Sequence, residues 1–133
     1  MTLTWEDHVA ITDVIALHGH LCDSGEGHRF SEVFTTDVTY DVTDFGMEVL
    51  HGLDALHEAA IAVGDRNPVG HHVTNIVLTQ QTDDRVLARS KGIGVYADGT
   101  SGSVTYDDTV VRLDQGWRIK HRVIRVRRVP LGG

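Results

Sequence analysis

The second half of the chain contains four long runs rich in Val, Ile, Thr and Tyr, separated only by short polar segments. The runs span residues 72–80, 85–96, 102–114 and 117–129. The segments between them, 81–84, 97–100 and 115–116, have the composition of hairpin turns. Such short connections join antiparallel neighbours, because parallel strands need a crossover of about a dozen residues or more. The sequence therefore predicts an antiparallel meander.

The first 70 residues show helical patterns instead. Thr4 can cap a helix with Asp7 three residues later, and apolar side chains then recur at spacings of three and four as far as Cys22. The segments that follow are predicted as a short helix with Phe30, Val33 and Phe34 on its buried side, a hairpin of residues 38–42 and 47–50, and a third helix over residues 52–63. Helices and a hairpin followed by a large antiparallel sheet define an α+β fold. With no linker or internal repeat, we expect one domain over residues 1–133.

Composition excludes several classes of protein. The chain has 12 Lys and Arg against 19 Asp and Glu, a formal net charge of −7, which disfavours nucleic-acid binding. It has no apolar run of the ~18–20 residues that a membrane span needs, and residues 1–7 lack signal-peptide character. The single cysteine, Cys22, excludes an intramolecular disulfide and a multi-cysteine zinc site. We expect a cytoplasmic protein with neither a nucleic-acid nor a membrane partner.

Basic residues are concentrated near the end of the chain. Seven of the 12 Lys and Arg lie between Arg112 and Arg128, whereas the first 65 residues contain only Arg29. Their alternation with Ile119 and Ile124 favours a solvated or inter-subunit face of the last strands. An anion-binding patch on the sheet is the alternative.

Histidine is the unusual component, with nine in 133 residues. His71 and His72 open the first long run, and adjacent strand residues point to opposite faces, so at most one of them lines the concave side. His18 and His20 point about 200° apart on a helix and do not form a chelating pair, which disfavours a metal site. Asp23 ends the first helix and either begins a turn in solvent or faces inward. A carboxylate and an imidazole in one apolar cavity would form a general base, although their spacing in sequence does not show that they meet.

The order of these segments resembles the SnoaL-like branch of the nuclear transport factor 2-like (NTF2-like) superfamily. The resemblance covers nearly all of the chain. It is carried by Leu21-Cys22-Asp23, Phe30-Ser31-Glu32-Val33-Phe34 with Asp37, Gly52-Leu53-Asp54-Ala55-Leu56, His72-Val73-Thr74-Asn75 and Gly116-Trp117-Arg118-Ile119. It implies a cone: a curved antiparallel sheet wrapped by about three N-terminal helices, with a ligand pocket inside.

Within this branch the chain is most similar to the scytalone dehydratase, bile acid dehydratase and hexachlorocyclohexane dehydrochlorinase families. In those families an Asp at the end of the first helix pairs with a His at the start of the first long strand, which implies that Asp23 pairs with His72. Dehydratases of this kind often carry a tyrosine where this chain has His18, and Tyr96 is the polar substitute for a second histidine of scytalone dehydratase. We expect four further residues at the substrate site: Phe30, Tyr40, Gly92 and Gly94. The two glycines either widen the pocket or form bulges that bend the sheet.

These features together predict a cofactor-free lyase or isomerase without a metal. His72, oriented by Asp23, would abstract a proton from a hydrophobic, cyclic substrate, and His18 or Tyr96 would donate a hydrogen bond to the leaving or enolate oxygen. The alternatives are a polyketide-type cyclase with the same base and a non-catalytic binding or assembly subunit like a dioxygenase β subunit. By analogy with the superfamily, we expect a homodimer or homotrimer.

Overall fold

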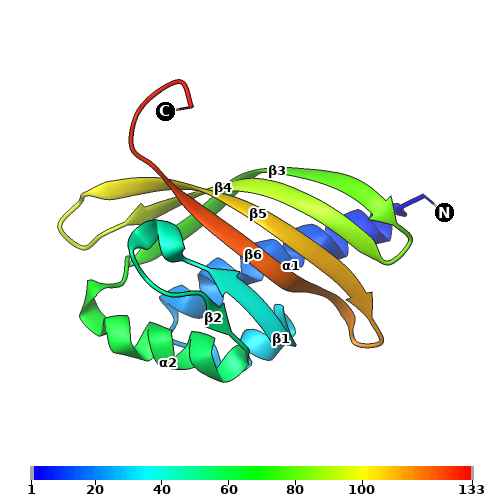
Figure 1. Ribbon diagram of the computed structural model, residues 1–133, viewed down its shortest axis with the longest axis horizontal. Coiled ribbons are helices and arrows are strands. Elements are labelled where there is room, and N and C mark those ends of the chain that lie inside the picture. The colour runs from blue at the N-terminus through cyan, green and yellow to red at the C-terminus, as the bar shows by residue number, and fades with distance from the viewer. Residues whose placement is uncertain (1, 133) are drawn as a thin grey trace.

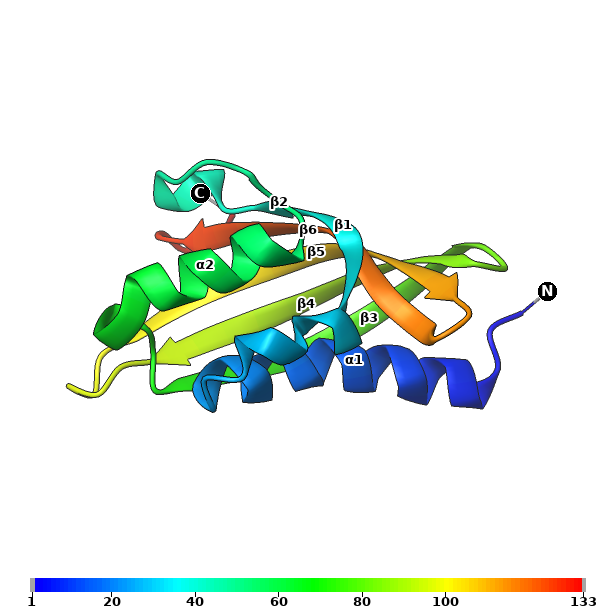
Figure 2. The ribbon, with the colours of Figure 1, turned by 90° about the horizontal axis from the view of Figure 1, so that it is seen from below.

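The computed structural model describes residues 2–132 and shows a curved, six-stranded sheet with helices against one face (Figures 1 and 2). The α-helices are α1 (Trp5–Asp23) and α2 (Leu53–Val63), and the 3₁₀ helices are η1 (Gly27–Glu32), η2 (Thr43–Phe45) and η3 (Gly64–Arg66). The strands are β1 (Phe34–Asp41), β2 (Leu50–His51), β3 (Gly70–Thr82), β4 (Arg85–Val95), β5 (Ser101–Leu113) and β6 (Gly116–Arg127). The α+β class is confirmed.

The sheet has the strand order β2-β1-β6-β5-β4-β3. Strands β3 to β6 form the predicted antiparallel meander. One pair in the sheet is not antiparallel, because β1 pairs with β6 in parallel. This arrangement is possible because the long chain segment from β1 to β6 contains the rest of the sheet. Strands β2 and β3 are the edges, so the sheet remains open between them.

Two predicted elements differ in detail from the structure. The second helix is the 3₁₀ helix η1, and Phe34, expected on its buried side, instead begins β1. The predicted hairpin is present, with Tyr40 opposite Leu50, but its second strand has only two residues. The third predicted helix is α2, which ends at Gly64 in a left-handed conformation (φ 54°) that favours glycine.

Helix α1 lies along β3 and contributes Ile11, Ile15 and Leu21 to the core. The helix approaches the strand closely at Gly19, where a Cβ atom would lie 2.7 Å from the carbonyl oxygen of His71. A larger residue at this position would push the helix away from the strand. Gly19 therefore sets the distance between the end of α1 and the start of β3.

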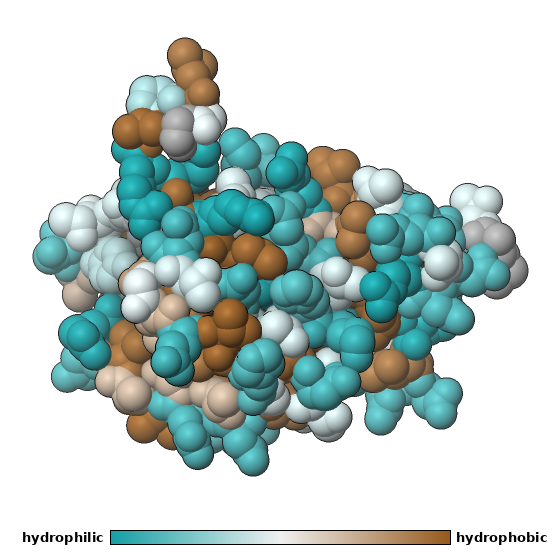
Figure 3. All heavy atoms as spheres, viewed as in Figure 1, coloured by the Kyte–Doolittle hydropathy of each residue, from teal (hydrophilic) through white to brown (hydrophobic). Residues whose placement is uncertain are grey.

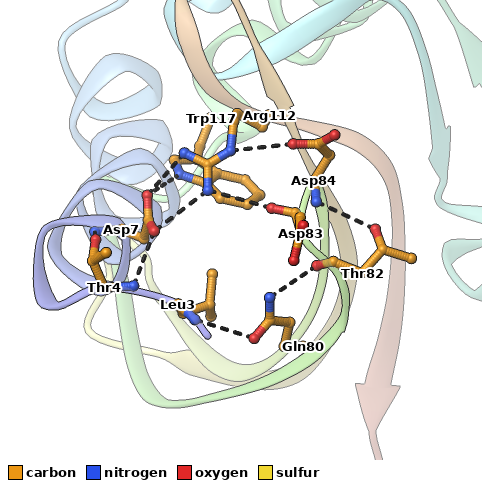
Figure 4. A network of polar contacts seen from close by, with 9 residues as sticks. All are labelled: Leu3, Thr4, Asp7, Gln80, Thr82, Asp83, Asp84, Arg112 and Trp117. Atoms are coloured by element: carbon orange, nitrogen blue, oxygen red, sulfur yellow. Dashed lines mark hydrogen bonds and ion pairs between the residues drawn. The ribbon is translucent and has the colours of Figure 1, made fainter. Parts of the chain in front are cut away.

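The first turn of α1 is tied to the β5–β6 hairpin (Figure 4). Thr4 and Asp7 form a capping box, with Asp7 N–H donating to Thr4 Oγ1 and Thr4 N–H donating to Asp7 Oδ2. The same Asp7 carboxylate accepts from Arg112 Nη1 at 3.0 Å and from Trp117 Nε1 at 3.1 Å. The Arg112 guanidinium also stacks on the Trp117 ring, 4.4 Å from its centroid. One carboxylate thus joins the helix start to the β5–β6 hairpin.

The surface seen in Figure 3 has apolar side chains dispersed among polar ones rather than in one continuous patch. Across the outer face of the meander, Asp107 pairs with both Arg89 and Arg125. Within residues 2–132, no helix is both long and apolar enough to cross a membrane.

Candidate active site

Asp23, the last residue of α1, contacts His71, the second residue of β3. The Asp23 Oδ1 atom lies 2.6 Å from His71 Nδ1, and the backbone N–H of His71 donates to the same carboxylate, with N···O distances of 3.0 and 3.1 Å. Two groups of one residue therefore hold one carboxylate, which fixes the position of the ring. The close approach of α1 to β3 at Gly19 makes this contact possible.

The contact determines the chemistry of the imidazole. An ionised carboxylate only accepts hydrogen bonds, so His71 Nδ1 carries a proton and Nε2 of the neutral ring has a lone pair. The side chains remain accessible, with exposed fractions of 20% for His71 and 28% for Asp23. This arrangement of carboxylate and imidazole has the form of a general base.

The prediction that Asp23 pairs with His72 is wrong. His72 follows His71 on β3 and points to the opposite face, where it is exposed beside Ile93, its neighbour on β4. The alternation along a strand allows only one of the two histidines to face α1. The register of β3 with β4 assigns that position to His71, opposite Gly94.

His18 lies deeper in the molecule and is buried. Three aromatic rings surround its imidazole, with centroids 5.1 to 6.1 Å away: Phe30, Phe34 and Tyr40. Its Nδ1 atom lies 2.7 Å from Arg122 Nη1, and its Nε2 atom lies 3.3 Å from Cys22 Sγ. Burial lowers the pKa of His18 well below its ordinary value, and the charge of Arg122 and the nearby His71 lower it further.

Arg122 and Asp108 form a buried ion pair at the centre of the concave face. Arg122 Nε and Nη2 donate to the two Asp108 oxygens at 2.7 and 2.9 Å, and both side chains have exposed fractions of 0%. Burial opposes the charged guanidinium, but the Asp108 carboxylate outweighs this effect and raises the pKa of Arg122 above its ordinary value. The guanidinium also lies over the Tyr106 ring, 4.3 Å from its centroid.

The interpretation of residues 112–128 as a solvated basic face is wrong for Arg122. The register between β5 and β6 shifts so that Thr109 faces His121 and Val110 faces Ile119, which leaves Lys120 as an extra residue. This bulge moves Arg122 to the inner face, where strict alternation from Ile119 would place His121. Sequence analysis missed Arg122 for this reason, and only the unusual density of arginine on one strand gave a signal. The bulge does not explain Asp108, which alternates with the buried Tyr106 and Val110 along β5, and this alternation is the signal that could have found it.

The remaining predicted site residues lie at different distances from the dyad that Asp23 and His71 form. Phe30 is buried against His18, and Tyr40 is half-buried beside it; burial raises the pKa of the Tyr40 hydroxyl. Gly94 lies directly opposite His71. Tyr96 follows β4 in a turn and is 38% exposed, and no hydrogen bond among the described residues joins its hydroxyl to Asp23 or His71.

The two glycines Gly92 and Gly94 are predicted either to widen the pocket or to form bulges, and Gly92 does neither. The pairing of β4 with both neighbours is regular at the two glycines, so neither is a bulge. A Cβ atom at Gly92 would collide with the Tyr106 ring, which occupies the space above this residue. Gly92 therefore admits an aromatic side chain of the protein itself and does not widen a pocket.

Two surface hollows lie away from the dyad. One, of about 580 Å³, lies between η1, β1 and the β5–β6 hairpin and includes Thr35 and Arg118. The other, of about 270 Å³, lies between Asp41, Asp44 and β6. Neither includes Asp23 or His71. Within residues 2–132, no group of three or more His, Cys, Asp or Glu side chains could hold a metal ion.

A curved, open sheet with helices against one face, and an Asp–His contact where the first helix meets the first long strand, define a small α+β protein. The chain belongs to the SnoaL-like domain family, whose model matches residues 4–123. No protein with a curated description matches the chain in sequence.

Several solved structures share the fold of this chain. A candidate aromatic ring hydroxylase from Novosphingobium aromaticivorans superposes with a TM-score of 0.81 at 24% identity, covering 96% of this chain and 94% of that one. A candidate scytalone dehydratase from the same organism has a TM-score of 0.74 at 23% identity, covering 91% and 84% of the two chains. LinA, a hexachlorocyclohexane dehydrochlorinase, has a TM-score of 0.78 at 19% identity, covering 95% and 90%. At these identities the similarity establishes the fold alone.

Proposed function

We propose that this protein is a cofactor-free lyase or isomerase in which His71, oriented by Asp23, is the general base. The observation that carries the proposal is the 2.6 Å contact between Asp23 Oδ1 and His71 Nδ1, reinforced by the backbone N–H of the same residue. The carboxylate fixes the ring so that Nε2 is basic, and it stabilises the imidazolium that forms when Nε2 takes a proton. His72, on the opposite face of β3, has no part in this mechanism.

Elimination of water is the reaction that we assign first. His71 Nε2 removes a proton from carbon next to a carbonyl group, and the electron pair of that bond forms a carbon–carbon double bond as the neighbouring C–O bond breaks. The leaving hydroxyl group takes a proton from the imidazolium and departs as water, which returns His71 to its neutral form. His18 or Tyr96 donates a hydrogen bond to the oxygen on which negative charge develops. No cofactor is needed, because the substrate's own carbonyl group stabilises the negative charge that develops at the deprotonated carbon, and the leaving hydroxyl group takes the electron pair of the broken C–O bond.

The family supports this class of reaction, since it includes dehydratases and isomerases. Two structures of similar fold are named for eliminations: the candidate scytalone dehydratase and the dehydrochlorinase LinA. The aromatic side chains of Phe30 and Tyr40 around His18 favour a hydrophobic, cyclic substrate. Cyclisation of a polyketide-like substrate by the same base is the nearest alternative.

The test uses a panel of cyclic β-hydroxyketones as substrates. Loss of water is monitored by the absorbance of the conjugated ketone that forms. We expect wild-type protein to dehydrate members of the panel and His71→Ala to reduce kcat/KM by about 10²- to 10⁴-fold, the usual contribution of a general base. Circular dichroism would show that the variant is folded. Unchanged turnover in folded His71→Ala would refute the assignment.

A second candidate function is a non-catalytic assembly subunit, which the packed interior favours. Arg122 and Phe34, with exposed fractions of 0% and 1%, fill the centre of the concave face where a large ligand would otherwise lie. Such a subunit would purify with a larger chain of fixed stoichiometry and would lack activity on the panel. A homodimer or homotrimer by light scattering, together with turnover, would support the enzyme instead.

A further inference from the structure

The Nδ1 atoms of His71 and His18 contact groups with opposite hydrogen-bonding roles, one an acceptor and the other a donor. His71 Nδ1 meets the carboxylate of Asp23, and His18 Nδ1 meets the guanidinium of Arg122 at 2.7 Å. A carboxylate only accepts hydrogen bonds, whereas a guanidinium only donates them and stays protonated in proteins. The partner of Nδ1 therefore dictates which form of each ring is present.

For His18 the consequence is definite. Arg122 Nη1 donates to Nδ1, so Nδ1 must present a lone pair and the single ring proton lies on Nε2. The reverse holds for His71, whose Nδ1 carries the proton and whose Nε2 presents the lone pair. The two rings thus offer opposite groups at Nε2: an N–H donor on His18 and a base on His71.

The guanidinium that contacts His18 is itself held by several partners. Both Asp108 oxygens accept from it, the rings of Tyr106 and Phe34 lie 4.3 and 5.7 Å away, and its exposed fraction is 0%. Rotation of the His18 ring would break the contact with Arg122 and leave a buried donor unpaired, which is unfavourable. The ion pair therefore fixes both the tautomer and the orientation of the ring.

We propose that the buried Asp108–Arg122 pair is a positioning device that holds His18 neutral, as an Nε2–H donor for an oxygen of the substrate. The role of the donor rests on the proposed function, whereas the tautomer of His18 does not depend on it. The present acceptor of this N–H is Cys22 Sγ at 3.3 Å, and sulfur is a weak acceptor that a substrate oxygen can replace. In this arrangement His71 acts as the base and His18 acts as the hydrogen-bond donor.

The tautomer can be measured without a substrate, by long-range ¹H–¹⁵N correlation spectra of the full-length protein. We expect His18 Nδ1 to resonate as an unprotonated nitrogen and Nε2 as a protonated one, without change between about pH 5 and 8. The charged or titratable groups that face His18 or its direct partners are Arg122, Asp108, Cys22, Tyr40, Tyr106, His71 and Asp23. Comparison with His18→Gln assigns the signals. A doubly protonated ring or an Nδ1–H tautomer in the wild type would overturn the proposal.

Removing the pair tests whether it is the cause. In Asp108→Leu/Arg122→Met, the fixed donor to Nδ1 is gone, and we expect the His18 signals to average between tautomers or to titrate. Asp108→Asn/Arg122→Gln serves the same purpose if the first variant does not fold, because an amide can either donate or accept. The matched control is Asp107→Asn/Arg125→Gln, an ion pair on the outer face of the same two strands, which should leave His18 unchanged. A fixed Nε2–H tautomer in the folded inner-pair variants would refute the positioning role.

The donor role is tested on whichever hydroxyketone the wild type dehydrates. We expect His18→Phe to lower kcat by about 10²- to 10³-fold with a smaller change in KM, and His18→Gln, which can still donate from a similar position, to recover part of the loss. If turnover requires His71 but His18→Phe keeps full kcat, the donor role fails while the proposed function stands. If the panel is not turned over at all, the proposed function fails and the spectra still decide the tautomer.

Discussion

At the scale of single residues, the decisive feature is which of two adjacent histidines faces α1. Sequence patterns place Asp23 at a helix end and a His-His pair at a strand start, and both placements are confirmed. The choice between His71 and His72 depends on the register of β3, which the sequence pattern leaves open by one residue. The family resemblance implies His72, but the close approach of α1 at Gly19 brings the carboxylate to His71.

Gly19→Ala should therefore destabilise the protein although alanine is the better helix former. Alanine in a helix normally gains up to about 1 kcal/mol over glycine, but here its Cβ would lie 2.7 Å from His71 O. We expect a net loss of about 1–3 kcal/mol in the free energy of unfolding, the range for overpacked sites, measured by urea denaturation. Stabilisation by the alanine would show that the helix and strand are not in tight contact.

At the scale of elements, α1 is held to the sheet at both ends by an aspartate. Asp23 binds the start of β3, and Asp7 binds Arg112 and Trp117 of the β5–β6 hairpin (Figure 4). The capping box at Thr4 is readable from sequence, because it is a local pattern. The second role of Asp7 is not, because its partners lie more than 100 residues away.

The Asp7 network should make stability depend on acidity in a predictable direction. Hydrogen bonds from Arg112, then from Thr4 and Trp117, hold the pKa of Asp7 well below its ordinary value. A carboxyl group with a lowered pKa in the folded state stabilises the protein above its unfolded pKa of about 3.9, and this stability is lost as the pH falls further.

We therefore expect Asp7→Asn to be less stable than wild type near neutral pH, with a gap in urea midpoint that narrows below about pH 4. Asp13→Asn, on the same helix and outside this network, is the control and should show neither effect. A gap of constant size down to the acid limit would contradict the assigned role of the Asp7 charge.

At the scale of the whole molecule, the meander and the helical wrapping follow from patterns that repeat along the chain. Repeating patterns do not predict the parallel pairing of β1 with β6 or the buried polar residues, because each depends on pairing between distant segments. The bulge at Lys120 is the clearest case: one extra residue turns Arg122 from an expected surface charge into a fully buried one. The functional interior of this fold is therefore set by register, which periodicity alone does not fix.

The buried pair should behave as a unit in stability measurements. Removing one partner leaves an uncompensated buried charge, so Asp108→Leu or Arg122→Met alone should cost about 3–5 kcal/mol of unfolding free energy. The double variant should be far less harmful, from neutral to stabilising by up to about 4 kcal/mol, because apolar side chains can fill the same space. Additive losses in a double-mutant cycle by urea denaturation would show that the two side chains are not coupled.

The proposed base is His71 and not its neighbour His72. The most direct measurement is therefore kcat/KM of His71→Ala beside that of His72→Ala, on the hydroxyketone that wild-type protein dehydrates best. The two variants remove the same side chain one position apart, from opposite faces of one strand. The structure predicts a loss of about 10²- to 10⁴-fold for His71→Ala and wild-type activity for His72→Ala. Equal losses, or a loss confined to His72→Ala, would contradict the assignment of the base.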